Sequence, residues 1–135
     1  MLAQMIVFSS IFLIFYGVIF LIGVLLTRWL AKLQEYSESW IPAIIMNLLY
    51  FGTTIGIGIL LYLIFDMEAL LQIHFIFALP LNILLGIMIS QHALVYDIDN
   101  YKDAFKFVIL NLILLFVLLI IAFFVSIFLF VIITF

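Results

Sequence analysis

The chain has 135 residues, of which 71% are hydrophobic and only 8% are charged. An ordinary soluble domain is about 45–50% apolar and about 25% charged, and a domain of this length has too little interior to hide the excess, so much of the apolar surface must face lipid. The net charge is −3 with four Lys and Arg residues, which excludes a nucleic-acid-binding protein, because such a protein needs a clustered basic surface. The absence of cysteine excludes disulfides, thiol nucleophiles and thiolate metal sites.

Four unbroken apolar stretches are long enough to cross a membrane, since about 20 residues of helix span its hydrocarbon core. They run from Met5 to Thr27, from Ile41 to Phe65, from Ala69 to Gln91 and from Phe107 to Phe135. The first lacks the basic flank of a secretory signal and is longer than the apolar part of one, so we interpret it as a retained span. The sequence predicts an all-α integral membrane protein with four transmembrane helices, which form a single domain over residues 1–135.

The connections predict how neighbouring spans are arranged. Only Asp66, Met67 and Glu68, the outer loop 66–68, separate the second and third stretches, so these two should form a tight antiparallel hairpin. Pro80 lies in the middle of the third stretch, and because proline has no N–H for the helix ladder it predicts a kink there. The last stretch has 29 uncharged residues, about 43 Å of helix against a core of about 30 Å, which predicts either a strong tilt or a partner subunit that covers its end.

The basic residues predict the orientation. Arg28 and Lys32 lie in the loop 28–40, Lys102 and Lys106 lie in the loop 92–106, and neither the outer loop nor the termini carry a base. Because Lys and Arg are retained on the inner side of a membrane, both loops should be inner and both termini outer. The compartment should be a bacterial cell membrane or the inner membrane of an organelle.

The loop 28–40 carries Trp29, Leu33, Tyr36 and Trp40 at spacings of four, three and four, which places them on one helical face. Two interpretations remain open here. Either the first helix continues past the membrane or bends onto its surface, or these residues form an interfacial aromatic belt on a short connector.

Small residues recur at intervals of four in the second and third spans. Gly52 and Gly56 form one such pair, and Gly86 and Ser90 follow Asn82 in another. Small residues let helix backbones approach closely in lipid, so this pattern favours helix packing, within the bundle or against another chain, over a substrate path.

Three amides, Asn47, Asn82 and Asn111, lie one in each of the last three spans. An amide in lipid is costly and should face the bundle interior. Interhelical hydrogen bonding is the simpler interpretation. The alternative is a polar path that these residues line together with Tyr16.

The two histidines, His74 and His92, are 18 residues apart, which is about 27 Å along a helix. They therefore cannot ligate one haem together, and a haem would need a partner chain or a symmetric copy to supply the second ligand. We predict no cofactor and no metal site, and we interpret both histidines as polar residues near the membrane faces.

Residues 90–107 hold about half of the ionisable side chains. The segment "DIDNYKD" begins like a calcium loop, but Lys102 stands where that loop needs glycine, so calcium binding of this type is rejected. Asn100 is predicted to cap the last helix, with Asp103 completing a capping box. His92 and Asp97 have no structural role in this scheme and are candidates for a docking contact at the inner face.

No nucleophile or acid–base pair is brought together by these patterns, which argues against an enzyme and gives no catalytic residue. Two functions remain. The first is a small non-catalytic integral subunit or accessory protein of a larger respiratory or transport complex, with lipid and other membrane subunits, or copies of itself, as partners. The second is a small oligomeric channel or carrier with a path lined by Asn82, Asn47 and Asn111.

Overall fold

The computed structural model describes residues 1–66 and 71–134, and in these ranges the chain is helical with no strand. The helices are α1 (Leu2–Leu33), α2 (Trp40–Phe65), α3 (Leu71–Phe77), α4 (Leu79–Ser90) and α5 (Tyr101–Thr134). The predicted all-α class is confirmed.

Three helical stretches are long and apolar enough to cross a membrane. They are Leu13–Leu33, Trp40–Phe65 and Tyr101–Thr134, with mean hydropathies of 2.1, 2.1 and 3.4. Together they indicate a membrane protein, because so much apolar helix surface is stable only in lipid. The predicted count of four spans is not reproduced by this criterion, since the third stretch is divided into two shorter helices.

The division falls at Ala78, two residues before Pro80. Pro80 has no N–H to donate to the carbonyl of Ile76, so the helical ladder loses a bond at this point. The ladder continues around the gap, because Ala78 N–H donates to the His74 carbonyl at 2.9 Å and Asn82 N–H donates to the Ala78 carbonyl at 2.9 Å. The irregularity predicted at Pro80 is therefore a local break, after which Pro80 occupies the first turn of α4.

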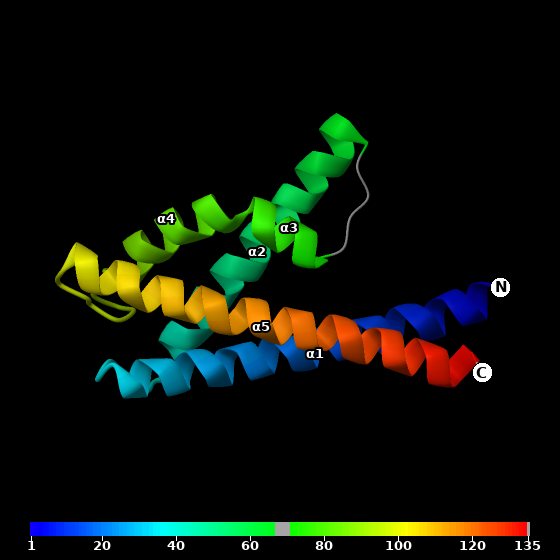
Figure 1. Cartoon of the computed structure of the whole chain (residues 1–135), viewed down its shortest axis with the longest axis horizontal. Helices are drawn as coiled ribbons and strands as arrows, with labels where there is room; N and C mark the ends of the chain where they lie inside the picture. The colour runs from blue at the N-terminus through cyan, green and yellow to red at the C-terminus, as the bar shows by residue number, and fades with distance from the viewer. Residues whose placement is uncertain (67–70, 135) are drawn as a thin grey trace.

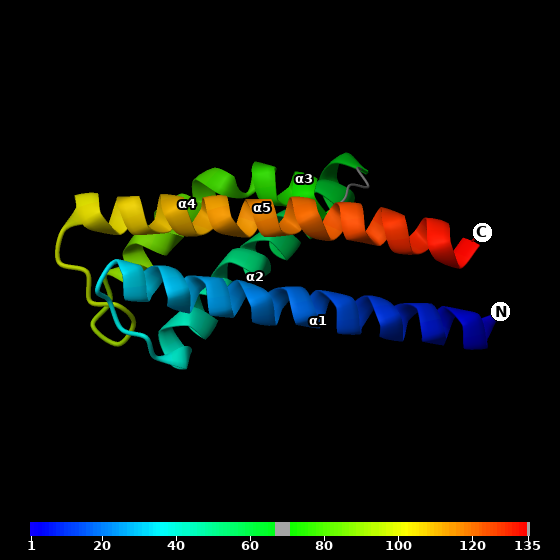
Figure 2. The same cartoon turned by 60° about the horizontal axis from the view of Figure 1, so that its bottom comes forward.

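Helices α1 and α5 lie side by side and antiparallel over much of their length, and both chain termini lie at the same end of the molecule (Figure 1). Helix α2 crosses behind them at an angle, and α3 and α4 lie along the first half of α5 (Figure 2). The largest fully buried side chains include Val24, Tyr50, Phe75 and Phe107, and Ile87 of α4 is also buried, so all five helices contribute to the core.

The helix ends add detail to the predicted loops. Helix α1 continues without interruption through Trp29 to Leu33, as one of the two interpretations of residues 28–40 expected, and it is closed by a left-handed residue at Glu35 (φ 64°). Helix α5 begins at Tyr101, so Lys102 and Lys106 lie in its first turns. The Asn100 side chain accepts a 2.8 Å hydrogen bond from Lys102 N–H, which confirms the predicted cap.

Candidate functional site

Four polar side chains from three helices form one hydrogen-bonded group in the core, called here the polar network: Thr27, Asn47, Tyr50 and Asn111. The Asn47 amide nitrogen donates to the Thr27 hydroxyl at 2.8 Å and to the Ala43 carbonyl at 2.9 Å. The Thr27 hydroxyl lies 2.9 Å from the Asn111 amide oxygen and 3.0 Å from its own helix's Gly23 carbonyl, and it can donate to either. The Asn111 amide nitrogen donates to the Tyr50 hydroxyl at 3.3 Å.

All four members of the polar network are 0% exposed. The network joins α1, α2 and α5 through polar contacts, and lipid offers no competing hydrogen bonds to these groups. As a chemical arrangement it contains only neutral donors and acceptors. It therefore fixes the relative rotation of three helices and has no group placed for acid–base chemistry at neutral pH.

Gly23 is required where the polar network meets α1. A Cβ atom at Gly23 would lie 2.7 Å from the Asn47 amide oxygen and 3.1 Å from Leu115. That oxygen has no conventional hydrogen-bond donor among residues 1–66 and 71–134. It lies against the Gly23 backbone instead, where a Cα–H group is a weak donor.

Asn82 lies close to the polar network in the fold but is not bonded to it. The Tyr50 hydroxyl packs against Gly86, one turn after Asn82 on α4, and a Cβ atom at Gly86 would lie 3.3 Å from that hydroxyl. Asn82 is 0% exposed, and neither its amide nitrogen nor its amide oxygen has a hydrogen-bond partner in the described part of the chain. The structure thus brings Asn47 and Asn111 together, while Asn82 remains separate.

Tyr16 belongs to the half of α1 that precedes the polar network. It lies 11 residues before Thr27 on α1, about 16 Å along the helix. Its half-buried ring packs edge-on against Phe15 at 5.7 Å. A path through all four predicted residues would have to include this intervening stretch of α1.

The predicted packing residues divide into two groups. Gly86 and Ser90 are buried on α4, and a Cβ atom at Gly86 would lie only 2.9 Å from Val108. Gly52 and Gly56 on α2 have nothing within 4 Å of the position that a Cβ atom would occupy. Only the first pair is in close contact with other helices of this chain.

His74 packs against α2, where a Cβ atom at Gly58 would lie 2.6 Å from its imidazole nitrogen Nδ1. Its other nitrogen, Nε2, is buried and has no hydrogen-bond partner among the described residues. The imidazole lines an open apolar hollow of about 300 Å³ together with Ile55, Gly58, Ile59, Tyr62 and Leu63.

His92 and Asp97 lie in the segment between α4 and α5, and both are exposed. The His92 imidazole and the Asp97 backbone take part in the turn, and the docking contact at these residues stays a prediction. The His92 imidazole accepts a 3.1 Å hydrogen bond from Leu94 N–H. The His92 carbonyl accepts from Val95 and Asp97 N–H groups at 3.0 and 3.1 Å, and Asp97 has left-handed backbone geometry (φ 51°). The described residues contain no group of three or more His, Cys, Asp or Glu side chains that could hold a metal.

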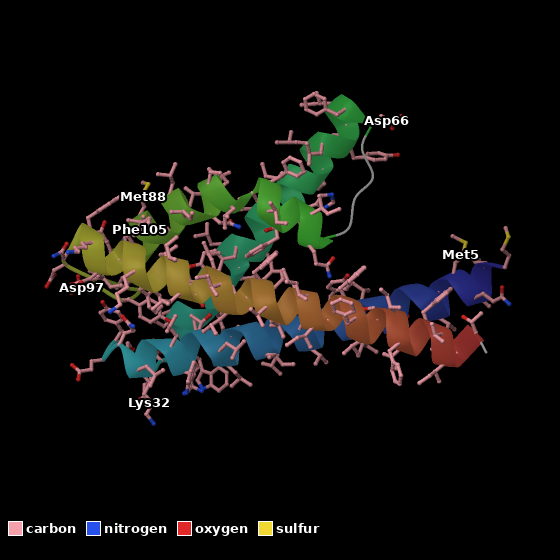
Figure 3. The ribbon with its side chains drawn as sticks, viewed as in Figure 1. Met5, Lys32, Asp66, Met88, Asp97 and Phe105 are labelled. Carbon is pink, nitrogen blue, oxygen red and sulfur yellow. The ribbon has the colours of Figure 1, made fainter. Side chains whose placement is uncertain are left out.

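This segment contacts the turn after α1 through aromatic side chains. The rings of Tyr36, Tyr96 and Phe107 pack on one another with centroids 4.9 to 6.3 Å apart. Burial raises the pKa of Tyr96, an effect that the nearby Arg28 opposes, and burial followed by the Asp103 charge raises the pKa of Tyr36. Figure 3 shows Lys32 and Asp97 at this end of the molecule and Met5 at the other.

Sequence reasoning missed Thr27, Gly23 and the role of Arg28. Thr27 was assigned only as the end of a span, although Gly23, Thr27 and Ala31 recur at intervals of four and are all buried, which was the available signal. The guanidinium carbon Cζ of Arg28 lies 3.9 Å from the centre of the Trp40 ring. The Arg28 Nε donates to the Glu38 carbonyl at 2.8 Å. Nothing in the spacing of these residues predicted that contact, because it depends on how the turn folds back.

The fold and this site define the chain as a helical membrane protein whose core is held by a neutral polar network. No protein-family model matches the chain, and no curated protein and no solved structure matches it.

Proposed function

We propose that this protein is a small non-catalytic integral subunit, or accessory protein, of a larger membrane complex, respiratory or transport, and that it acts by packing α2 against a helix of another chain. The observation that carries the proposal is the open backbone surface at Gly52 and Gly56. In lipid, helices associate where small residues let two backbones approach.

The contrast among the glycines supports this assignment. Gly23, Gly58 and Gly86 are already filled by side chains of this chain, so their role is internal. Gly17, Gly52 and Gly56 are not filled. Of these three, Gly52 and Gly56 lie four residues apart on one helix, and exposed Leu48, Ile55 and Ile59 flank them on α2. Ile55 and Ile59 also line the apolar hollow beside His74. The open surface around Gly52 and Gly56 is therefore continuous with a concave surface that a partner side chain could enter.

We further propose that α3 and α4 together form the fourth span, in a hairpin with α2, and that both termini are on the outer side. Residues 71–90 give about 30 Å of helix, which matches the hydrocarbon core. Two contacts support the antiparallel arrangement: Gly58 of α2 lies against His74, and Tyr50 lies against Gly86. The four basic residues lie toward the end of the molecule opposite both termini, which favours that end as the inner one.

The topology can be tested because the chain has no cysteine. Single cysteines at Ser37 and Gln4, both exposed, would be treated with a membrane-impermeant maleimide in intact cells. We expect labelling at Gln4→Cys and labelling of Ser37→Cys only after the membrane is opened. The reverse pattern would contradict the proposed orientation, and equal labelling of both would contradict the span count.

The proposed function is tested by comparing Gly52→Leu/Gly56→Leu with Gly17→Leu. All three glycines have open space at the Cβ position, so the substitutions should be tolerated by the chain itself and the two variants should unfold like the wild type. Tagged protein would be purified from its native membrane and the co-purifying chains quantified by mass spectrometry. We expect a defined set of partners with the wild type and Gly17→Leu and their loss with the double variant. Retention of the same partners by the double variant would contradict the proposal.

The alternative function, a small oligomeric channel or carrier, is favoured by the unbonded Asn82 in the core. Solute flux in liposomes that contain only this chain, abolished by Asn82→Leu, would establish it in place of the subunit role.

A further inference from the structure

The strongest unexplained feature of the core is the side chain of Asn82. It is completely buried, and both of its polar atoms lack hydrogen-bond partners in residues 1–66 and 71–134. A buried amide without partners is costly, and neither lipid nor a neighbouring protein can reach a side chain that is 0% exposed. A small molecule enclosed within this chain would satisfy both polar atoms.

The surroundings of Asn82 can be placed by register. Gly58 lies against His74 and Tyr50 lies against Gly86, so Thr54, midway between the two α2 positions, faces the region between Ala78 and Asn82. Thr54 is fully buried and donates its hydroxyl hydrogen to the Tyr50 carbonyl at 2.7 Å. Its oxygen keeps the capacity to accept a further bond.

Small side chains flank Asn82 on its own face. Ala78 lies one turn before it and Gly86 one turn after it, and both are buried. The space at Gly86 is occupied by Val108 and Tyr50, so the water is expected on the Ala78 side. The neighbourhood thus combines short side chains with donors and acceptors that are all uncharged, a setting suited to a small neutral molecule and unsuited to an ion.

We propose that Asn82 is the centre of an internal hydration site, in which water bonds to the Asn82 amide between α2 and the α3–α4 break. Buried water characteristically makes about three hydrogen bonds to groups that would otherwise be unsatisfied. The Asn82 amide provides a donor and an acceptor, and the Thr54 hydroxyl provides an acceptor within the same region. The site does not depend on a partner at α2, so the hydration proposal and the subunit proposal are tested independently.

The test uses the full chain in lipid bilayers with isotope-labelled asparagine, observed by water-edited solid-state NMR. We expect magnetisation transfer from water to the Asn82 side-chain amide, and loss of that signal in Asn82→Leu. Asn111 is the matched internal control, because its amide oxygen is bonded to Thr27 and its amide nitrogen to Tyr50, so it should receive no transfer. Exposed Asn100 is the positive control.

Two outcomes would overturn the proposal. One is the absence of transfer to Asn82 while Asn100 responds. The other is transfer to Asn111 as strong as that to Asn82, which would indicate water throughout the core and no specific site. Substitution of Ala78 by Leu gives an independent check, since a larger side chain beside Asn82 should remove its water signal and leave that of Asn100 unchanged.

Discussion

The polar network and Asn82 place the same kind of side chain in the same core with opposite results. Asn47 and Asn111 are bonded to Thr27 and Tyr50 across three helices, whereas Asn82 has no protein partner among the described residues. The difference shows that the residue type of an amide in a membrane helix does not by itself reveal its role. A partnered amide joins its helix to the neighbouring helices, and for the unpartnered one we propose a bound water.

The largest effect should come from Asn111→Leu. This change removes the bonds to Thr27 and Tyr50 and leaves two buried hydroxyls with fewer partners, so we expect the free energy of unfolding to fall by about 2–3 kcal/mol. Titration with SDS from mixed micelles, followed by circular dichroism, measures the change. A loss no larger than that caused by Asn82→Leu would remove the distinction between the two regions.

Gly23→Ala should have the next largest effect. The added Cβ atom would lie 2.7 Å from the Asn47 amide oxygen, so Asn47 must move away from Thr27, at a cost of about 1–2 kcal/mol. Gly17→Ala is the control, because nothing lies within 4 Å of its Cβ position, and it should be neutral or slightly stabilising. Equal stability of the two variants in the same SDS titration would show that the tight contact at Gly23 is not maintained.

Asn82→Leu should change the free energy of unfolding by less than about 1 kcal/mol in either direction. Replacing the Asn82 amide and its proposed water with an apolar side chain of similar size removes the donor and the acceptor together. The Thr54 hydroxyl keeps its bond to the Tyr50 carbonyl. A loss as large as that for Asn111→Leu would indicate a protein partner for Asn82 and would contradict the contrast with the polar network.

The smallest expected effect is a pH dependence of the free energy of unfolding, which comes from the aromatic cluster formed by Tyr36, Tyr96 and Phe107 and is absent at neutral pH. The folded pKa values of both tyrosines are raised from 10.0, so the protonated forms are favoured by folding. Their contribution is fully present below pH 10 and is lost as the pH rises through the folded values. We expect stability to fall as the pH rises above about 10, and to fall less steeply in Tyr96→Phe. A Tyr96→Phe variant with an unchanged alkaline slope would exclude Tyr96 as the source.

Much of the fold could be predicted from local sequence. The helices α1, α2 and α5 follow from unbroken apolar runs, and the cap at Asn100 follows from its position before Tyr101. The break at Ala78 was displaced by two residues from the predicted kink at Pro80. Proline removes a bond to the residue four positions earlier, so the irregularity falls on its N-terminal side.

The candidate site could be predicted only in its components. Asn47 and Asn111 were expected to face the interior, but their common partner Thr27 was not identified, because the partner of a polar group depends on which helix lies opposite. Likewise, Gly52 and Gly86 lie in similar four-residue patterns, yet one is open and the other is filled by Val108 and Tyr50. His92 and Asp97 received structural roles from backbone geometry that spacing does not reveal.

Composition by itself determined that this chain is helical and built for lipid, because a surplus of apolar residues without β alternation can be satisfied only by helices in a membrane. The order of residues along the chain placed the four basic residues in two segments, which the fold brings to one end. The tertiary structure decided which amides pair, which glycines are filled and where Asn82 is enclosed. These choices depend on the rotation of each helix about its axis, which is fixed by contacts between residues as far apart as Thr27 and Asn111.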